Sequence, residues 1–282
     1  MQQEPSVGSA WASTILNYAA HYDLPVDKLC ARVGLSPEAL LDHSQRLPSW
    51  QLQQLFAECA AAGAGTQFGC ELQAGLTTSC LQGLNILLDS AATLGASLNC
   101  LVEYLPEIMG HIQVELCKDG NNHRLLFTAP GEQPHAYGLD ASTLALVRNM
   151  ARRVGLAPAE LFTEVHITAR QHCGDTLDSW GVNRRYAEHL CLVLPSAALA
   201  LPLLGANEFL HQNLLNNWGR TPNPATNAGN DGLRLARYWL KSSDQPIESI
   251  ATRIGYSQVS NFIRAFRKQY GITPKKFRLS TC

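Results

Sequence analysis

Two short amphipathic helices joined at a glycine, over residues 246–278, constrain the folding of this chain more than any other stretch. In the first helix, apolar residues recur at the i, i+3, i+4, i+7 spacing of one helical face: Ile247, Ile250, Ala251 and Ile254. The second helix repeats the spacing with Val259, Phe262, Ile263 and Phe266. Pro246 suits the first turn, Gly255 suits a left-handed helix end, and Ser257 can cap the second helix. The pattern predicts two helices joined by a tight turn and packed through their apolar stripes.

The other side of the second helix is polar and basic. The residues that project from it are Ser257, Gln258, Ser260, Asn261, Arg264, Arg267 and Lys268, and Lys275 and Lys276 follow shortly after. Amide and guanidinium groups can pair with base edges in the major groove of DNA, and lysine can meet phosphate. An ordinary helical hairpin with a solvated charged face fits the same spacing. From the spacing alone, both interpretations stay open.

Charge is distributed unevenly along the chain. The 282 residues carry a net charge of −1, yet residues 231–282 hold ten Lys or Arg and three Asp or Glu. The remaining 230 residues hold twelve Lys or Arg and twenty Asp or Glu, so a basic carboxyl-terminal part follows an acidic amino-terminal part. This asymmetry favours a polyanionic partner for the carboxyl-terminal part only.

The same stretch resembles the second helix-turn-helix of the AraC/XylS family of bacterial transcription regulators. The residues that carry the resemblance are the 247–254 helix, Gly255-Tyr256-Ser257, Phe262, Arg264-Ala265-Phe266-Arg267-Lys268, Gly271-Ile272-Thr273-Pro274 and Phe277-Arg278. The resemblance implies that the second helix enters the major groove of double-stranded DNA. Arg264, with Asn261 or Ser260, would then read bases, while Arg267, Lys268, Lys275 and Lys276 would hold phosphates. RNA polymerase would be a further partner if the protein activates transcription.

The sequence pattern of the amino-terminal part predicts helices first and strands later. Helices are expected over residues 9–22, 25–42 (two short ones), 50–62, 78–106 (two, divided near Thr93–Ala96) and 141–154. Alternating polarity and a turn at 119–122 predict a hairpin over 111–129, with further strands at 162–168 and 189–194. Residues 25–42 have the pattern of a second helix-turn-helix. The second of these two helices carries acidic residues and no arginine, which disfavours contact with DNA. The order indicates an α+β domain.

Residues 12–210 also resemble the sensor half, called arabinose-binding-like, of a subgroup of the same family. The residues that carry this resemblance are Arg46-Leu47-Pro48, the Leu84–Leu88 helix with Thr93-Leu94-Gly95 before Tyr104-Leu105, the strand Val165–Ala169, and Leu190–Leu194 with Leu201-Pro202-Leu203. The resemblance implies a small, mostly antiparallel sheet and a pocket for a small-molecule effector. The pocket residues cannot be read from the sequence. Four polar residues interrupt the apolar segments of this domain and are plausible members of the pocket: Tyr104, His135, Tyr137 and Arg148.

We therefore expect a sensing and dimerisation domain over 1–215, a linker over 216–232, and a small all-α helix-turn-helix domain over 233–282. The linker is rich in Asn, Pro, Gly and Thr. Family members carry two helix-turn-helix units, and this segment is too short to hold the first. The leading hypothesis is a sequence-specific regulator that responds to an effector, with dimerisation left open. The alternative is an interaction protein, impaired in DNA binding, that dimerises with full-length regulators or sequesters effector.

Other classes of function find little support in the residues. Nine scattered cysteines without a CxxC pair predict reduced core thiols in a cytoplasmic protein. The amino-terminal residues have no signal-peptide pattern, and no stretch has the length of a membrane span. His172-Cys173-Gly174-Asp175 has nucleophile and base residue types but is expected to be a loop after a strand. Neither a metal-ligand spacing nor a glycine-rich phosphate loop occurs, so we expect no enzyme activity, no metal and no cofactor.

Overall fold

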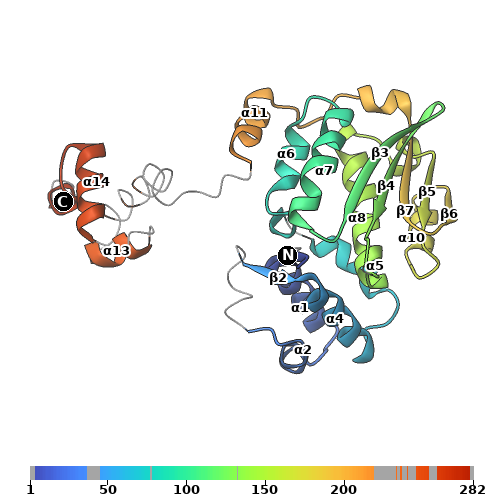
Figure 1. The fold of residues 1–282 in the computed structure, drawn as a ribbon, viewed down its shortest axis with the longest axis horizontal. Helices are drawn as coiled ribbons and strands as arrows, with labels where there is room; N and C mark the ends of the chain where they lie inside the picture. The colour runs from blue at the N-terminus through green and yellow to red at the C-terminus, as the bar shows by residue number, and fades with distance from the viewer. Residues whose placement is uncertain are drawn as a thin grey trace. The chain divides into compact units, whose positions relative to one another are not determined.

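The computed structural model describes residues 4–36, 45–76, 78–131, 133–218, 233, 236, 240, 246–253 and 259–279. Its contacts divide the chain into two compact units, Met1–Asn216 and Asn217–Cys282, each of which is described by itself (Figure 1). Residues 219–232 of the predicted linker, the turn Gly255-Tyr256-Ser257 and most of the predicted helix 233–241 lie outside the described residues.

Helices make up most of the first unit. They are α1 (Ser9–His21), α2 (Val26–Val33), α4 (Ser49–Ala61), α5 (Phe68–Leu72), α6 (Leu84–Ser90), α7 (Leu94–Ile108), α8 (Ala136–Val154), α9 (Pro158–Leu161), α10 (Gly174–Ser179) and α11 (Glu208–Asn217). Short 3-10 turns occupy Gln73–Gly75, Thr78–Leu81 and Ser196–Ala200. The side chain of Thr93 caps α7 by accepting a hydrogen bond from the Ala96 amide at 3.3 Å, which explains why the predicted pair of helices divides there.

The strands form one main sheet and one small one. The main sheet has the order β3 (Gln113–Asp119), β4 (Asn122–Thr128), β7 (Leu190–Pro195), β5 (Glu164–Ile167) and β6 (Arg184–Tyr186). Its neighbours are antiparallel except for the parallel pair β5 and β6. The small sheet pairs β1 (Ser6–Gly8) with β2 (Arg46–Pro48). The predicted fold, an α+β domain with a mostly antiparallel sheet, is confirmed.

One apolar core joins the amino-terminal helices to α8. Trp11, Leu55, Phe56 and Phe68 are nearly inaccessible and lie in one cluster with Tyr137. Figure 1 shows α1, α2 and α4 on one side of the unit, while α7 and α8 lie beside the main sheet. The core therefore fixes α8 relative to α1 and α4, and all three helices contribute residues to the cavity described below.

Several predicted boundaries are wrong. The helix expected over 50–62 begins one residue earlier, at Ser49, and Pro48 takes the capping position. Helix α8 begins at Ala136 rather than 141 because His135 caps it, its Nδ1 accepting from the Tyr137 amide. The expected loop at 172–175 becomes helical from Gly174. Strand β6 was not predicted, since three residues are too few to show alternation.

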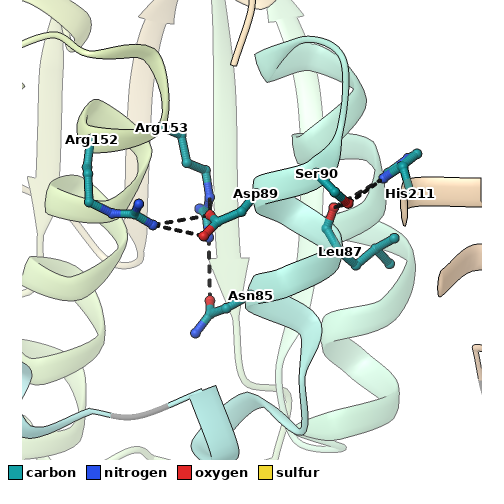
Figure 2. Close-up of polar contacts among 7 residues, drawn as sticks. All are labelled: Asn85, Leu87, Asp89, Ser90, Arg152, Arg153 and His211. Carbon is teal, nitrogen blue, oxygen red and sulfur yellow. Dashed lines mark hydrogen bonds and ion pairs between the residues drawn. The ribbon is translucent and has the colours of Figure 1, made fainter. Parts of the chain in front are cut away.

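Ion pairs between one aspartate of α6 and two arginines of α8 connect the two helices (Figure 2). Asp89 accepts from Arg153 Nε at 2.6 Å and from an Arg152 terminal nitrogen at 3.0 and 3.2 Å. The Arg153 side chain is only 5% exposed, whereas that of Arg152 is 58% exposed. Burial lowers the pKa of Arg153 and the Asp89 charge opposes that shift, so the two effects partly cancel.

The helix that ends this unit is also anchored on α6. The Nδ1 atom of His211, in α11, lies 3.1 Å from Ser90 Oγ and 3.2 Å from the Leu87 carbonyl oxygen (Figure 2). Asn207 precedes α11, and its side-chain oxygen accepts a hydrogen bond from the Leu210 amide in the first turn. The start of the segment that leads to the second unit is therefore held by hydrogen bonds to α6.

Helices are the only regular secondary structure in the described part of the second unit. It contains α13 (Ile247–Arg253), α14 (Val259–Tyr270) and α15 (Pro274–Leu279), and residues 233, 236 and 240 are helical as well. Its hydrophobic core contains the buried residues Leu233, Ala236, Leu240, Ile250, Ala251, Phe262 and Phe266. Nowhere in the described ranges is a helix long and apolar enough to cross a bilayer.

Candidate nucleic-acid interface and ligand cavity

Helix α14 has an apolar back that holds it against its neighbours. Phe262 and Phe266 are completely buried, and their ring centroids lie 5.7 Å apart. Phe266 also contacts Tyr270 at 4.7 Å and Phe277 of α15 at 5.7 Å between centroids. Such aromatic contacts add to the burial of apolar area. The predicted stripe is confirmed, and it determines which side of α14 faces solvent.

The predicted DNA-contacting residues that the structure describes all lie on the surface. Those on α14 are Ser260, Asn261, Arg264, Arg267 and Lys268, and those on α15 are Lys275 and Lys276. Ser257 and Gln258 lie outside the described residues. Asn261, Arg264 and Lys268 follow the i, i+3, i+7 spacing of one helical face. No acidic residue occurs in the sequence after Glu248, so no carboxylate of α14 or α15 neutralises this face.

The turn after α14 positions the two lysines of α15. Gly271 has a positive φ of 77° and its amide donates to the Arg267 carbonyl at 2.8 Å, which ends α14. Thr273 Oγ1 accepts from the Lys276 amide at 3.3 Å, and Pro274 begins α15. A basic surface on a firmly packed helix, followed by two more cations, can contact both base edges and phosphates.

A cavity of about 380 Å³ lies in the first unit, between helices, sheet and loops. Apolar side chains form its deep part, and those buried most completely are Trp11, Leu52, Phe56, Leu105, Phe127 and Leu190. The exposed lining residues are Gln133, Arg170, Glu188 and His189, which lie on loops or beside strand ends. The cavity is therefore mostly apolar inside and more polar at its rim, as small-molecule sites commonly are.

Two polar atoms in this wall are buried without a hydrogen-bond partner among the described residues. They are Trp11 Nε1 and Thr168 Oγ1, and both side chains line the cavity. Leaving such a group unsatisfied costs roughly 1–3 kcal/mol. At the rim, Arg170 donates to Gln133 Oε1 at 3.3 Å. Burial lowers the pKa of the nearby His135, and the charges of Arg170 and His172 add to that shift.

The polar residues singled out in the sequence do not line this cavity. Tyr104, His135, Tyr137 and Arg148 are all absent from its wall. The Tyr137 hydroxyl donates to the Gly65 carbonyl at 2.6 Å, and Arg148 donates to Gln73 Oε1 at 3.4 Å. The lining is assembled from α1, α4, α7, β4, α8, β7 and four loops. No local pattern marks residues so far apart in the chain, so only the fold could identify them.

The His172–Asp175 segment serves a structural purpose. Buried Asp140 accepts from the amides of His172 at 2.9 Å and Cys173 at 3.1 Å, and lies 3.3 Å from His172 Nδ1. Burial, with the nearby Asp140 charge, raises the pKa of the Cys173 thiol far above its usual value. A thiol held protonated is a poor nucleophile.

The described cysteines are all free thiols, in keeping with the prediction of reduced cysteines. The prediction that they lie in the core is wrong for Cys117, which is exposed on β3. Within the described ranges, no group of three or more His, Cys, Asp or Glu side chains is placed to hold a metal ion.

Comparison with known proteins gives matches to both units. The profile of a family described as "Arabinose-binding domain of AraC transcription regulator, N-term" matches residues 24–203. A "Helix-turn-helix domain" profile matches residues 232–280.

Individual relatives match over parts of their length. The HTH-type transcriptional activator RhaS of Pectobacterium atrosepticum is 30% identical over 150 residues, which cover 49% of this chain and 51% of that protein. The HTH-type transcriptional activator FapR of Escherichia coli is 51% identical over 47 residues, 17% of this chain and 18% of that protein. The chain thus spans about half or less of these curated relatives. Among solved structures, the transcriptional regulator CdpR from Pseudomonas aeruginosa matches with a TM-score of 0.48 and 15% identity, over 90% of this chain and 96% of that one.

Proposed function

The chain belongs to the AraC family of transcription regulators with an arabinose-binding-type amino-terminal domain, and from this premise we propose that it binds DNA sequence-selectively under the control of a small-molecule effector. Helix α14 inserts into the major groove, and the cavity of the first unit takes the effector. The relatives' names describe activators and regulators of transcription, so the proposal assigns this chain no catalytic step.

The observation that carries the proposal is the two-sided character of α14. Phe262 and Phe266 are fully buried, while Asn261, Arg264 and Lys268 share the opposite, exposed face. Arg264 is well placed to read a base, since guanidinium pairs with guanine edges in the major groove. Lys276, on the first turn of α15, is placed to contact phosphate, which carries no sequence information. Removal of each side chain should therefore affect DNA binding in a different way.

The test begins with selection of a preferred duplex from a random pool, using the full chain. Arg264→Ala should then weaken binding of the selected duplex by about 1–3 kcal/mol while leaving a scrambled duplex nearly unaffected. Lys276→Ala should weaken both duplexes alike and reduce the dependence on salt. Arg148→Ala, which removes an exposed cation of the first unit, is the matched control. Equal losses on both duplexes for Arg264→Ala would refute its role in base reading.

A second function has one observation in its favour. Only 28 residues, 204–231, lie between the matched sensor region and the matched helix-turn-helix region, and a single reading helix buries little surface. The chain would then act by pairing with longer regulators or by sequestering effector. Selection that enriches no sequence at low salt, together with concentration-dependent dimerisation in sedimentation, would favour this function over DNA reading.

A further inference from the structure

We propose that the cavity of the first unit binds a small monocarboxylate with an apolar body, its carboxylate paired with Arg170. This inference rests on the proposed function, because the ligand it describes is the effector. It goes further by naming the chemical class of that effector and the residue that recognises its charge.

The apolar body of the ligand is indicated by the gradient of polarity in the cavity. Trp11, Leu52 and Phe56 form part of the deep wall and are each at most 3% exposed. Removing apolar ligand surface from water against such a wall is favourable, roughly in proportion to the area buried. A sugar would have to bury several hydroxyl groups against this mostly apolar wall. Trp11 Nε1 and Thr168 Oγ1 could pair with some of them, but each hydroxyl left without a hydrogen-bond partner would oppose binding.

The charge of the ligand is indicated by the rim. Among the described lining residues, Arg170 is the only Arg or Lys, and its hydrogen-bond partner is the neutral Gln133. Glu188, the only lining carboxylate among them, is 88% exposed and lies 3.8 Å from His189. A guanidinium without a described carboxylate partner can form a two-pronged contact with a ligand carboxylate. The lowered pKa of His135, caused by burial and then by Arg170 and His172, agrees with a positive local potential.

The size of the site limits the ligand further. A cavity of about 380 Å³ lies at the small end of ligand-binding sites, which favours a ligand smaller than a peptide or a nucleotide with several phosphates. An aliphatic or aromatic acid of modest length fits both its volume and its polarity.

The experiment measures dissociation constants of the full chain by calorimetry for octanoate, octanol and L-arabinose. Octanoate should bind more tightly than octanol, and arabinose should not bind. In Arg170→Gln, octanoate should bind about 10- to 100-fold more weakly while octanol is unchanged, because only the charge-assisted contact is lost. Ser142→Phe, which fills the cavity, should abolish binding of octanoate and octanol.

Arg148→Gln is the matched control. Arg148 is also exposed and also donates to a glutamine Oε1, that of Gln73 at 3.4 Å, but it does not line the cavity. It should leave all three constants unchanged.

Three results would overturn the inference: equal binding of octanoate and octanol, preference for arabinose, or no binding of any of the three probes. An unchanged dissociation constant for octanoate in Arg170→Gln would show that Arg170 does not pair with the carboxylate. Each of these outcomes leaves DNA selection by the free protein untouched, so failure of this inference is distinguishable from failure of the proposed function.

Discussion

Replacing Asp89 with alanine should destabilise the first unit more than any exposed charge change, because it strands a buried guanidinium. Asp89 is the anionic partner of Arg153, whose side chain is 5% exposed, at 2.6 Å. After the substitution, the remaining described partner of that guanidinium is the Asn85 amide oxygen at 3.4 Å (Figure 2). Breaking a buried pair by removing one partner typically costs 3–5 kcal/mol. Because Asp89 is itself 37% exposed, we expect the low end, about 3 kcal/mol.

Arg152 provides the internal comparison. It contacts the same carboxylate at 3.0 Å, but its side chain is 58% exposed. Arg152→Ala should therefore cost less than about 1 kcal/mol. A third variant, Asp89→Ala combined with Arg153→Met, removes the stranded charge and should regain part of the loss.

Urea unfolding and thermal unfolding, followed by circular dichroism, measure these differences. For a unit of this size, Asp89→Ala should lower the midpoint temperature by roughly 6–12 °C, and Arg152→Ala by only a few degrees. The urea midpoint should fall without a change in slope. Equal losses for Asp89→Ala and Arg152→Ala, or no recovery in the double variant, would refute the argument from burial.

Two further predictions concern α5 and the buried carboxylate. In Gly69→Ala the new Cβ would lie 2.5 Å from the Tyr137 Cα, so we expect a loss of about 1–3 kcal/mol in urea unfolding. Gly75→Ala, whose new Cβ would lie at ordinary contact distances of 3.7 Å from Thr14 and 3.9 Å from Tyr18, should change little. Burial raises the pKa of Asp140 above its unfolded value, despite hydrogen bonds from Cys173 and His172 that act in the opposite direction. The folded state therefore binds more protons, and its stability falls as pH rises from the unfolded pKa through the folded one. Asp140→Asn should lack this fall, and identical pH profiles of unfolding would contradict it.

Strong local periodicity explains what could be predicted from the sequence. The stripe of α14 repeats over a full helix, and the hairpin of β3 and β4 combines alternation with a turn at Gly120. Both signals are local, because the period of a helix or strand directly places residues on one face. The exposure of Arg264 and Lys268 follows from the burial of Phe262 and Phe266 on the opposite side.

The ligand cavity and the buried ion pair depend on contacts between distant parts of the chain. Trp11, Phe127 and Arg170 meet at one cavity, although more than a hundred residues of sequence separate the first from the second. Likewise, nothing near Arg153 in the sequence distinguishes it from Arg152, and only the packing of α6 against α8 buries one of them. Such features arise from tertiary packing, which local patterns do not encode.

The affinity of the full chain for its selected duplex and for a scrambled duplex, measured by anisotropy over a range of salt concentrations, tests the central claim most directly. The account predicts tighter binding of the selected duplex at every salt concentration, with both affinities falling linearly in logarithmic plots as counterions are released. Equal affinity for the two duplexes at every concentration would contradict it, since α14 would then contact phosphates without reading bases.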